Sequence, residues 1–347
     1  MDKIVYLLGN GGTVAEMSRQ GVESDLSMEA IGDNVMEMSK NIKGAYWQLG
    51  QRFGLPPRQD IELIISLLEG CTDLEAIKFS NMCNEVRRLF REYLISQITA
   101  KNVEPKILIS LLHLHNTYGS NMGDTGEELS GIITINYDSL SDEAMSYIYG
   151  GINYGYPYDS DDYQNNDSAP FLLKLHGSLN WRITNDKLQV SRQFENTGYD
   201  DDNSGWIPPS VYKKPTGKVY EITWNKAVEL LTGCDILRVV GSSLRNEDFV
   251  LISLLFTSRT QKTPPFDIQL IVSDEASLGT EDSKGIMQRM PFLGKMKNIS
   301  SLPEYESDRA YTGNPFYDWI TMKISQLEKK GIDLSEDEIL NKMLWER

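Results

Sequence analysis

Four short apolar runs of this sequence end in glycine or polar residues of the kinds that bind ligands or move protons. The residues that follow these runs are Gly9-Asn10-Gly11-Gly12, Asn136-Tyr137-Asp138, His176-Gly177 and Gly241-Ser242-Ser243. Glycines directly after a strand let the backbone approach a phosphate, and the N-terminus of a following helix favours an anion. The first set lacks the third glycine of the G-x-G-x-x-G pattern, so a plain tight turn is the alternative. His176 can be a general base or a buried core residue, and Asn136 and Asp138 can bind a ligand or cap the next helix.

The apolar runs themselves predict a parallel sheet. Residues 3–8, 132–135, 171–175, 236–240 and 268–272 are almost continuously apolar, as strands buried on both faces of a sheet must be. Helical stretches separate several of them, for instance 225–231 and 248–257. The predicted fold class is therefore α/β with a Rossmann-like parallel sheet. Because ligands bind at the carboxyl ends of such strands, we expect the residues that follow them to meet in one crevice.

A block of residues with a helical pattern lies between the first and second predicted strands. From about residue 25 to 118 the chain is rich in Leu, Ile, Met, Glu and Lys at helical spacing, with a helix expected after Asp60, another over 74–98 and a third over 107–115. We interpret this block as a helical insertion in a domain that spans residues 1–290. Residues 291–347 are expected to form a helical extension on the surface or against a partner.

Charge and cysteine content argue against several classes of protein. The formal net charge is −16, without the dominant basic footprint that neutralises phosphates, so no direct binding of nucleic acid is expected. The 3 cysteines show no C-x-x-C spacing, which rules out a zinc ribbon, and His113 and His115 do not share a helix face, so no metal site is predicted. The sequence shows neither a signal peptide nor a run of about 18 apolar residues that could span a membrane. We therefore expect a cytoplasmic protein.

Four ordered elements of the sequence together resemble the sirtuin family. Residues 131–144, GIITINYDSLSDEA, resemble the family's Thr-x-Asn-x-Asp element, and residues 171–181, FLLKLHGSLNW, are similar to its His-Gly element. Trp206-Ile207-Pro208-Pro209 with Thr223-Trp224-Asn225-Lys226, and then residues 236–249, ILRVVGSSLRNEDF, resemble later elements of bacterial sirtuin-like domains. The resemblance covers roughly residues 3–275.

This resemblance implies NAD as substrate and gives the candidate residues their roles. Asn136 would orient the nicotinamide ribose or a water, and His176 would be the general base. Asp138 would orient Asn136 or bind the nicotinamide side. The remaining candidates would bind the rest of NAD: Gly9, Asn10, Gly11 and Gly12 the diphosphate, Gly241 and Ser242 a phosphate or the adenosine ribose, and Asp274 a ribose hydroxyl, with a plain loop as its alternative.

Two departures from the family shape the expected activity. Asn10 stands where the family's Gly-Ala-Gly-x-Ser opening has alanine, which puts the phosphate contacts in doubt. The zinc-ribbon cysteines of the protein deacylases are absent, and this favours hydrolysis of NAD itself over deacylation. Sirtuin-like domains of this zinc-free type are often NAD-depleting effectors of bacterial anti-phage defence, so the resemblance implies an NAD+ glycohydrolase (NADase), a hydrolase with an antiviral role.

Two other functions remain open at this point. A protein deacylase or an ADP-ribosyltransferase would use the same site with a groove for an acceptor. A non-catalytic NAD-sensing scaffold subunit would bind NAD without turnover. Because unregulated hydrolysis of NAD would kill the host, we expect the chain to be restrained by homo-oligomer packing, by the helical block over the crevice or by a partner. The resemblance suggests a HerA-type ATPase or a short Argonaute as that partner, and the sequence does not select between them.

Overall fold

The computed structural model of the chain describes most of the sheet domain and the main helices. The described residues are 1–22, 26, 28–38, 61–72, 77–99, 102–121, 123–194, 204–210, 215–242, 244, 248–272, 286–287, 290–294, 296–299 and 314–345. Asp274, one of the predicted ribose-binding residues, lies outside them.

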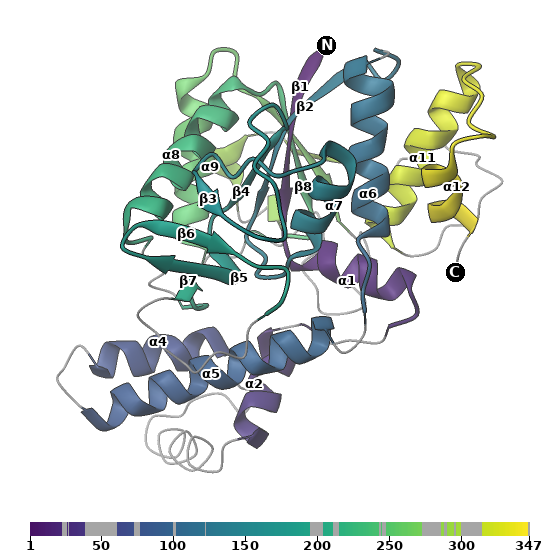
Figure 1. Cartoon of the computed structure of the whole chain (residues 1–347). Helices are drawn as coiled ribbons and strands as arrows, with labels where there is room; N and C mark the ends of the chain where they lie inside the picture. Colours follow the sequence, from purple (N-terminus) through teal and green to yellow (C-terminus); the bar gives the residue numbers. More distant parts are fainter. Residues whose placement is uncertain are drawn as a thin grey trace.

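A six-stranded parallel sheet forms the centre of the molecule (Figure 1). Its strands are β1 (Asp2–Leu8), β2 (Glu127–Thr134), β4 (Phe171–Lys174), β8 (Ile236–Val240), β9 (Asp267–Ile271) and β10 (Met296–Asn298). They lie in the order β10-β9-β8-β1-β2-β4. The first strand, β1, lies in the middle, β2 and β4 follow on one side of it, and β8, β9 and β10 follow on the other. This is the strand order of a doubly wound Rossmann sheet, which confirms the predicted α/β fold.

Both faces of the sheet are covered, which explains why its strands are continuously apolar. Ile4, Tyr6 and Leu8 of β1 belong to one core, while Val5 and Leu7 belong to the other. Helices α8 (Lys218–Gly233) and α9 (Phe249–Gln261) pack on the second of these faces. Helices α1 (Asn10–Arg19), α6 (Lys106–His113) and α7 (Leu140–Tyr149) cover the first.

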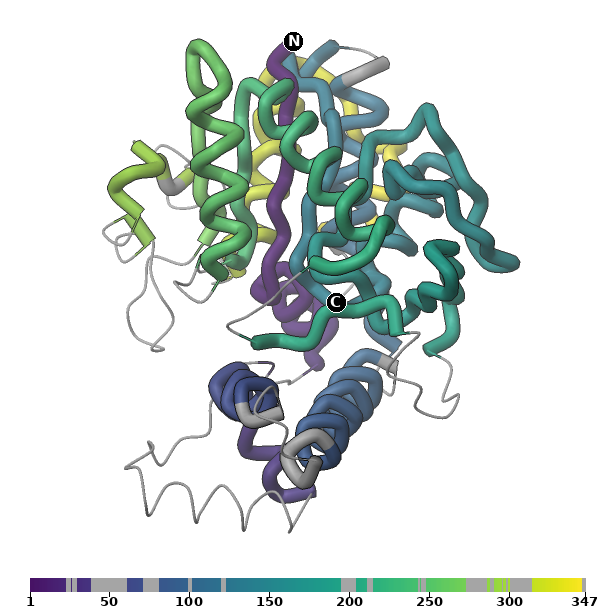
Figure 2. Tube along the Cα trace, turned by 90° about the vertical axis from the view of Figure 1, so that its left-hand side faces the viewer, coloured from purple at the N-terminus to yellow at the C-terminus, as the bar shows by residue number. Residues whose placement is uncertain are grey.

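Three helices of the predicted insertion stand apart from the sheet, beyond the carboxyl ends of its strands. They are α2 (Met28–Met38), α4 (Ile61–Thr72) and α5 (Ile77–Thr99), here called the helical lobe. Figures 1 and 2 both show this lobe at the bottom of the molecule, below the end of β1. The chain then returns to the sheet through α6 and a π-helical segment, Leu114–Asn121. The lobe is therefore placed where the predicted crevice opens.

A second, smaller sheet, most of whose strands follow the His-Gly element, was not predicted. Its strands are β3 (Tyr158–Asp159), β5 (Gly177–Thr184), β6 (Lys187–Val190) and β7 (Ser204–Trp206), in the order β3-β6-β5-β7. β5 and β6 form an antiparallel hairpin whose two loop residues, Asn185 and Asp186, both have positive φ, 50° and 59°. Asparagine and aspartate tolerate this left-handed backbone, which a tight two-residue hairpin turn requires.

The C-terminal helices are fixed to the sheet by a buried cluster of charges. Helix α11 (Pro315–Lys329) brings Lys323 to within 2.9 Å of the Glu127 carboxylate, and Arg238 of β8 binds the same carboxylate with two contacts of 2.6 and 2.8 Å. Trp319 of α11 lies under the Arg238 guanidinium, 5.0 Å from ring centroid to Cζ. Helix α12 (Glu338–Trp345) follows, and Asp337 just before it lies 2.7 Å from the His113 imidazole of α6.

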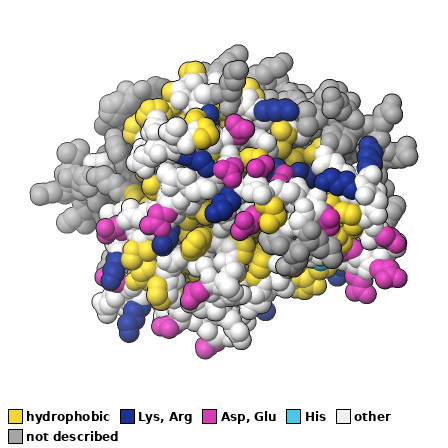
Figure 3. All heavy atoms as spheres, turned by 90° about the horizontal axis from the view of Figure 1, so that it is seen from above, with side chains coloured by type: hydrophobic (Ala, Val, Ile, Leu, Met, Phe, Trp, Pro, Cys, Tyr) yellow, Lys and Arg dark blue, Asp and Glu magenta, His cyan; other side chains and the backbone are white. Residues whose placement is uncertain are grey.

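The outer surface mixes charges of both signs. In Figure 3, which views the molecule from above, lysine and arginine side chains lie among aspartate and glutamate side chains and apolar patches. Within the described part of the chain, no helix combines the length and the apolar character that a membrane span requires.

The buried cluster of Glu127, Arg238 and Lys323 should make the folded chain less stable in acid. Burial would raise the pKa of Glu127, but Arg238 and Lys323 outweigh it and lower that pKa to about 2, from an ordinary 4.5. A carboxyl whose pKa is lower in the folded state stabilises the fold above pH 4.5, and this contribution is lost as the pH falls toward 2. It amounts to roughly 3 kcal/mol in the free energy of unfolding. Urea unfolding across a pH series measures it.

Lys323→Met provides the comparison for this prediction. Removing one of the two cations raises the pKa of Glu127, so the variant should begin to lose stability at a higher pH than the wild type. Curves of the same shape for the two proteins would contradict the assignment to Glu127.

Candidate functional site

Two glycine turns meet at the carboxyl ends of β1 and β8. A Cβ atom on Gly11 would lie 2.6 Å from the Cα of Gly241, and one on Gly9 would lie 2.6 Å from the Cβ of Ser242. Gly241 has a φ of +58°, which also favours glycine. These glycines are therefore required by the contact between the turns, at the switch point where such sheets bind ligands.

The backbone of the first turn is already hydrogen-bonded within the protein. The N–H groups of Gly9, Gly11 and Gly12 donate to the carbonyls of Val240, Gly241 and Gly9, at 2.9, 2.8 and 2.9 Å. An anion at this turn would thus be stabilised mainly by the N-terminal end of α1 as a whole. Contact of these glycines with a diphosphate stays a prediction.

Asn136 and Asp138 are joined through Thr13. The Asn136 amide donates to the Gly9 carbonyl and to the Thr13 hydroxyl, both at 3.0 Å, and that hydroxyl donates to Asp138 at 2.5 Å. Asp138 also accepts from the N–H of Leu140, the first residue of α7, at 3.0 Å. Both amide hydrogens of Asn136 are engaged, so the atom that it can offer to a ligand is the acceptor Oδ1. Asp138 orients Asn136 through Thr13 and also binds the first N–H of the next helix, whose N-cap residue is Ser139.

His176 lies between the main sheet and the small sheet and is 4% exposed. Its carbonyl accepts from the N–H of Ile207 at 2.8 Å, and its ring lies against Tyr137, with 6.2 Å between ring centroids. The next residue, Gly177, has a φ of +67°, and a Cβ there would lie 2.0 Å from the carbonyl oxygen of Gly205. The glycine of the His-Gly element is therefore needed for β7 to close over the histidine.

A fully buried lysine connects the strand of His176 to the turn of Asn136. Lys174 of β4 donates to the Asp138 carbonyl and to the Asp142 carboxylate, both at 2.6 Å, and neither charged side chain is exposed. Tyr154 also donates to Asp142. The ammonium thus bridges the two segments that carry the candidate pair.

These segments surround one pocket with about 920 Å³ of empty space, including its open mouth. Six of the predicted site residues line it: Asn10, Asn136, Asp138, His176, Gly241 and Ser242. Gly9 and Gly11 lie behind it, in the contact between the turns. The helical lobe supplies an opposite wall of Ile31, Glu62, Phe90, Leu94 and Ile98. The pocket is therefore built jointly by the sheet and the lobe.

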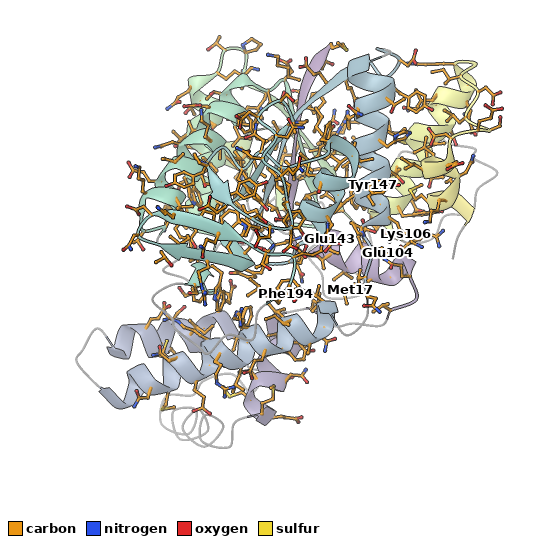
Figure 4. All side chains as sticks on the ribbon, in the orientation of Figure 1. Met17, Glu104, Lys106, Glu143, Tyr147 and Phe194 are labelled. Carbon is orange, nitrogen blue, oxygen red and sulfur yellow. The ribbon has the colours of Figure 1, made fainter. Side chains whose placement is uncertain are left out.

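Helix α1 binds the chain just before and just after the helical lobe. The amide of Asn10 donates to the Leu26 carbonyl at 2.7 Å, where the chain enters the lobe. Glu16, fully buried, accepts from the N–H groups of Ile107 and Leu108 at 2.9 and 2.7 Å, where the chain returns into α6. In Figure 4, Glu104 and Lys106 mark this return near Met17 of α1. The structure thus shows Asn10 tying the lobe to α1, while its predicted contact with a diphosphate stays a prediction.

Several residues at the site were not predicted from the sequence. Thr13, Glu62, Phe90 and Asp248 all line the pocket. Lys174 carried a usable signal, since a lysine inside the apolar run FLLKL must find a buried partner. Glu62 and Phe90 carried none, because nothing in their helices shows which face meets the pocket. Among the described residues, no group of three or more His, Cys, Asp or Glu side chains is placed to hold a metal ion.

Comparison with protein-family models and with curated proteins finds no match for the sequence. Among solved structures, the chain is similar to a Sir2 homologue in complex with NAD, at 13% identity and a TM-score of 0.46, over 94% of this chain and 90% of that one. It is also similar to a Sir2 homologue bound to 2′-O-acetyl ADP-ribose, at 14% identity, a TM-score of 0.41 and coverage of 93% and 92%. A third is Sir2Tm bound to a propionylated peptide, at 13% identity, a TM-score of 0.39 and coverage of 95% and 94%. These TM-scores and identities indicate a loose structural similarity, so the proposed function rests on the residues of the pocket.

The contact between the glycine turns predicts opposite effects for two adjacent glycines. Gly11→Ala forces a methyl group against the Gly241 backbone and should lower the free energy of unfolding by about 1–3 kcal/mol. Gly12→Ala is the matched control, since its added Cβ has no described neighbour within 4 Å other than the adjacent residues and backbone of its own helix. It should leave stability unchanged or raise it by up to about 1 kcal/mol. Denaturant unfolding measures both, and equal losses would contradict this account of the turns.

The buried ammonium predicts a large loss for Lys174→Met. The substitution leaves the Asp142 carboxylate buried without its cation, which should cost about 3–5 kcal/mol in the free energy of unfolding. Adding Asp142→Asn removes the stranded charge and should recover part of that loss. Lys226→Met, which breaks an exposed pair with Glu229, should cost less than about 1 kcal/mol. If Lys174→Met costs no more than Lys226→Met in chemical denaturation, the bridge has no such role.

Proposed function

We propose that this chain is an NAD+ glycohydrolase that cleaves the bond between nicotinamide and ribose. The observation that carries the proposal is that Asn136 and His176, from different strand ends, line one pocket beside the N-terminal turn of α1. Asn136 and His176 both belong to the sirtuin-like elements of the sequence, and the absence of zinc-ribbon cysteines favours hydrolysis over deacylation.

The proposed cleavage requires the protein to position the substrate and the water and to supply a general base. The nicotinamide of NAD+ is a cationic leaving group, so the C–N bond breaks with its electron pair going to nitrogen and leaves an oxocarbenium-like ribose. Water adds at that ribose carbon and gives its proton to His176, either directly or through a ribose hydroxyl. The Asn136 Oδ1 accepts a hydrogen bond from the ribose or the water and fixes its orientation. The products are nicotinamide and ADP-ribose, or a cyclic form where a ribose hydroxyl or an adenine nitrogen replaces water.

Such an activity suits an NAD-depleting effector of bacterial anti-phage defence, under control of a partner or an oligomer. The helical lobe over the pocket is the part of this chain that could restrain it. A homo-oligomer, a HerA-type ATPase or a short Argonaute would then act by changing access to the pocket. We propose that the protein works in the cytoplasm.

Nicotinamide release from NAD+ tests the proposal. The wild type should release nicotinamide, alone or with the products of neighbouring genes. His176→Ala should lower the rate by about 10²–10⁴-fold, the usual contribution of a positioned base. Asn136→Ala should lower it by about 10²-fold, the cost of a misplaced substrate or water. His113→Ala, which alters a histidine bonded to Asp337 away from the pocket, should retain the activity.

Two outcomes would replace the proposed NAD+ glycohydrolase activity with another function. Release that requires an acylated peptide or another acceptor would make the chain a transferase or a deacylase. Binding of NAD+ without release under any condition would make it a sensor or scaffold subunit.

A further inference from the structure

One carboxylate of the pocket comes from the helical lobe and has no role in the mechanism above. Glu62 lies in the first turn of α4, where the positive end of the helix dipole stabilises a negative charge. Its side chain is 5% exposed and lines the same pocket as Asn136 and His176. The lobe thus places a buried carboxylate opposite the candidate catalytic pair.

Three acidic side chains lie among the described residues of the pocket. Of the described residues that line it, Glu62, Asp138 and Asp248 carry carboxylates and none is a lysine or an arginine. The pKa of Tyr137 is raised well above its ordinary value by burial and then by the charges of Glu62 and Asp248. Because Tyr137 lies against the His176 ring, both carboxylates act near that ring.

The lobe that carries Glu62 is held against the sheet domain. Asn10 and Glu16 of α1 bind the chain just before and just after the lobe through the hydrogen bonds described above. Phe90 of α5 packs against Tyr137 and Trp206, with 6.0 and 5.8 Å between ring centroids. A dinucleotide in this pocket would meet a helix N-terminus, which favours anions, and an otherwise apolar wall with one carboxylate, which favours a cation.

We propose that Glu62 makes the pocket specific for the oxidised, cationic nicotinamide ring of NAD+. This inference rests on the proposed function, since it concerns the same pocket. The positive charge resides on the ring in the bound substrate and moves onto the ribose as the C–N bond breaks. A carboxylate near both atoms favours binding and cleavage, whereas the neutral ring of NADH gains nothing from it. ADP-ribose, which has no ring, gains nothing either.

Calorimetric binding of NAD+, NADH and ADP-ribose tests the proposal. A His176→Ala parent prevents consumption of NAD+ during the titration. This parent should bind NAD+ about tenfold more tightly than NADH, a ratio in the range expected for one close charge pair. Adding Glu62→Gln should remove that preference and leave the affinity for ADP-ribose within about twofold. Adding Glu92→Gln instead neutralises an exposed glutamate of the same lobe, and it should change nothing.

The possible outcomes distinguish a failure of this inference from a failure of the proposed function. Equal affinities for NAD+ and NADH in the parent overturn the inference alone, and this readout holds even where Glu62→Gln fails to fold. An equal loss for all three ligands in the Glu62→Gln variant also overturns it, because that result is general damage to the pocket. Failure of the wild type and the parent to bind either NAD+ or ADP-ribose overturns the proposed function and this inference with it. Glu62→Asp, which keeps the charge, should retain most of the preference for NAD+.

Discussion

The candidate site depends on one buried ammonium group. Lys174 joins the strand that leads to His176 with the turn that carries Asn136 and Asp138, through two contacts of 2.6 Å. An unpaired charge at this depth would cost several kcal/mol, so the ammonium requires the Asp142 carboxylate and the Asp138 carbonyl in fixed positions. Lys174 therefore links the strand that leads to His176 to the turn that carries Asn136.

Helix α1 connects this arrangement to the rest of the molecule. It begins at the glycine turn that packs against Gly241, supplies Thr13 to the chain of hydrogen bonds between Asn136 and Asp138, and binds the chain just before and just after the helical lobe. Its Glu16 is fully buried, and burial raises the pKa of that carboxyl to about 8 against the pull of the backbone N–H donors. This helix of ten residues thus supplies Asn10 and Thr13 to the pocket and binds the chain on either side of the lobe that completes it. The insertion is part of the site rather than an addition to it.

Much of the fold could be predicted because the strands of a parallel sheet that is covered on both faces are continuously apolar in the sequence. The runs at 3–8, 132–135, 171–175, 236–240 and 268–272 all proved to be strands, since each buries side chains on two faces. The residues after four of those strands met around one pocket because parallel strands end at one edge. The small sheet was missed, although Leu179, Trp181 and Ile183 alternate with polar residues before the Asn185-Asp186 turn, which is a hairpin pattern. Glu62 could not be found, because its role depends on how a separate lobe packs against the sheet, and no local pattern encodes that.

The most direct test of this account is an experimental structure of the His176→Ala variant with NAD+ bound. The account predicts the diphosphate near the N-terminus of α1, the nicotinamide ribose within hydrogen-bonding distance of the Asn136 Oδ1, and the nicotinamide ring between position 176 and Glu62. NAD+ bound elsewhere, or bound here with its adenine against Glu62 and its nicotinamide in solvent, would contradict it.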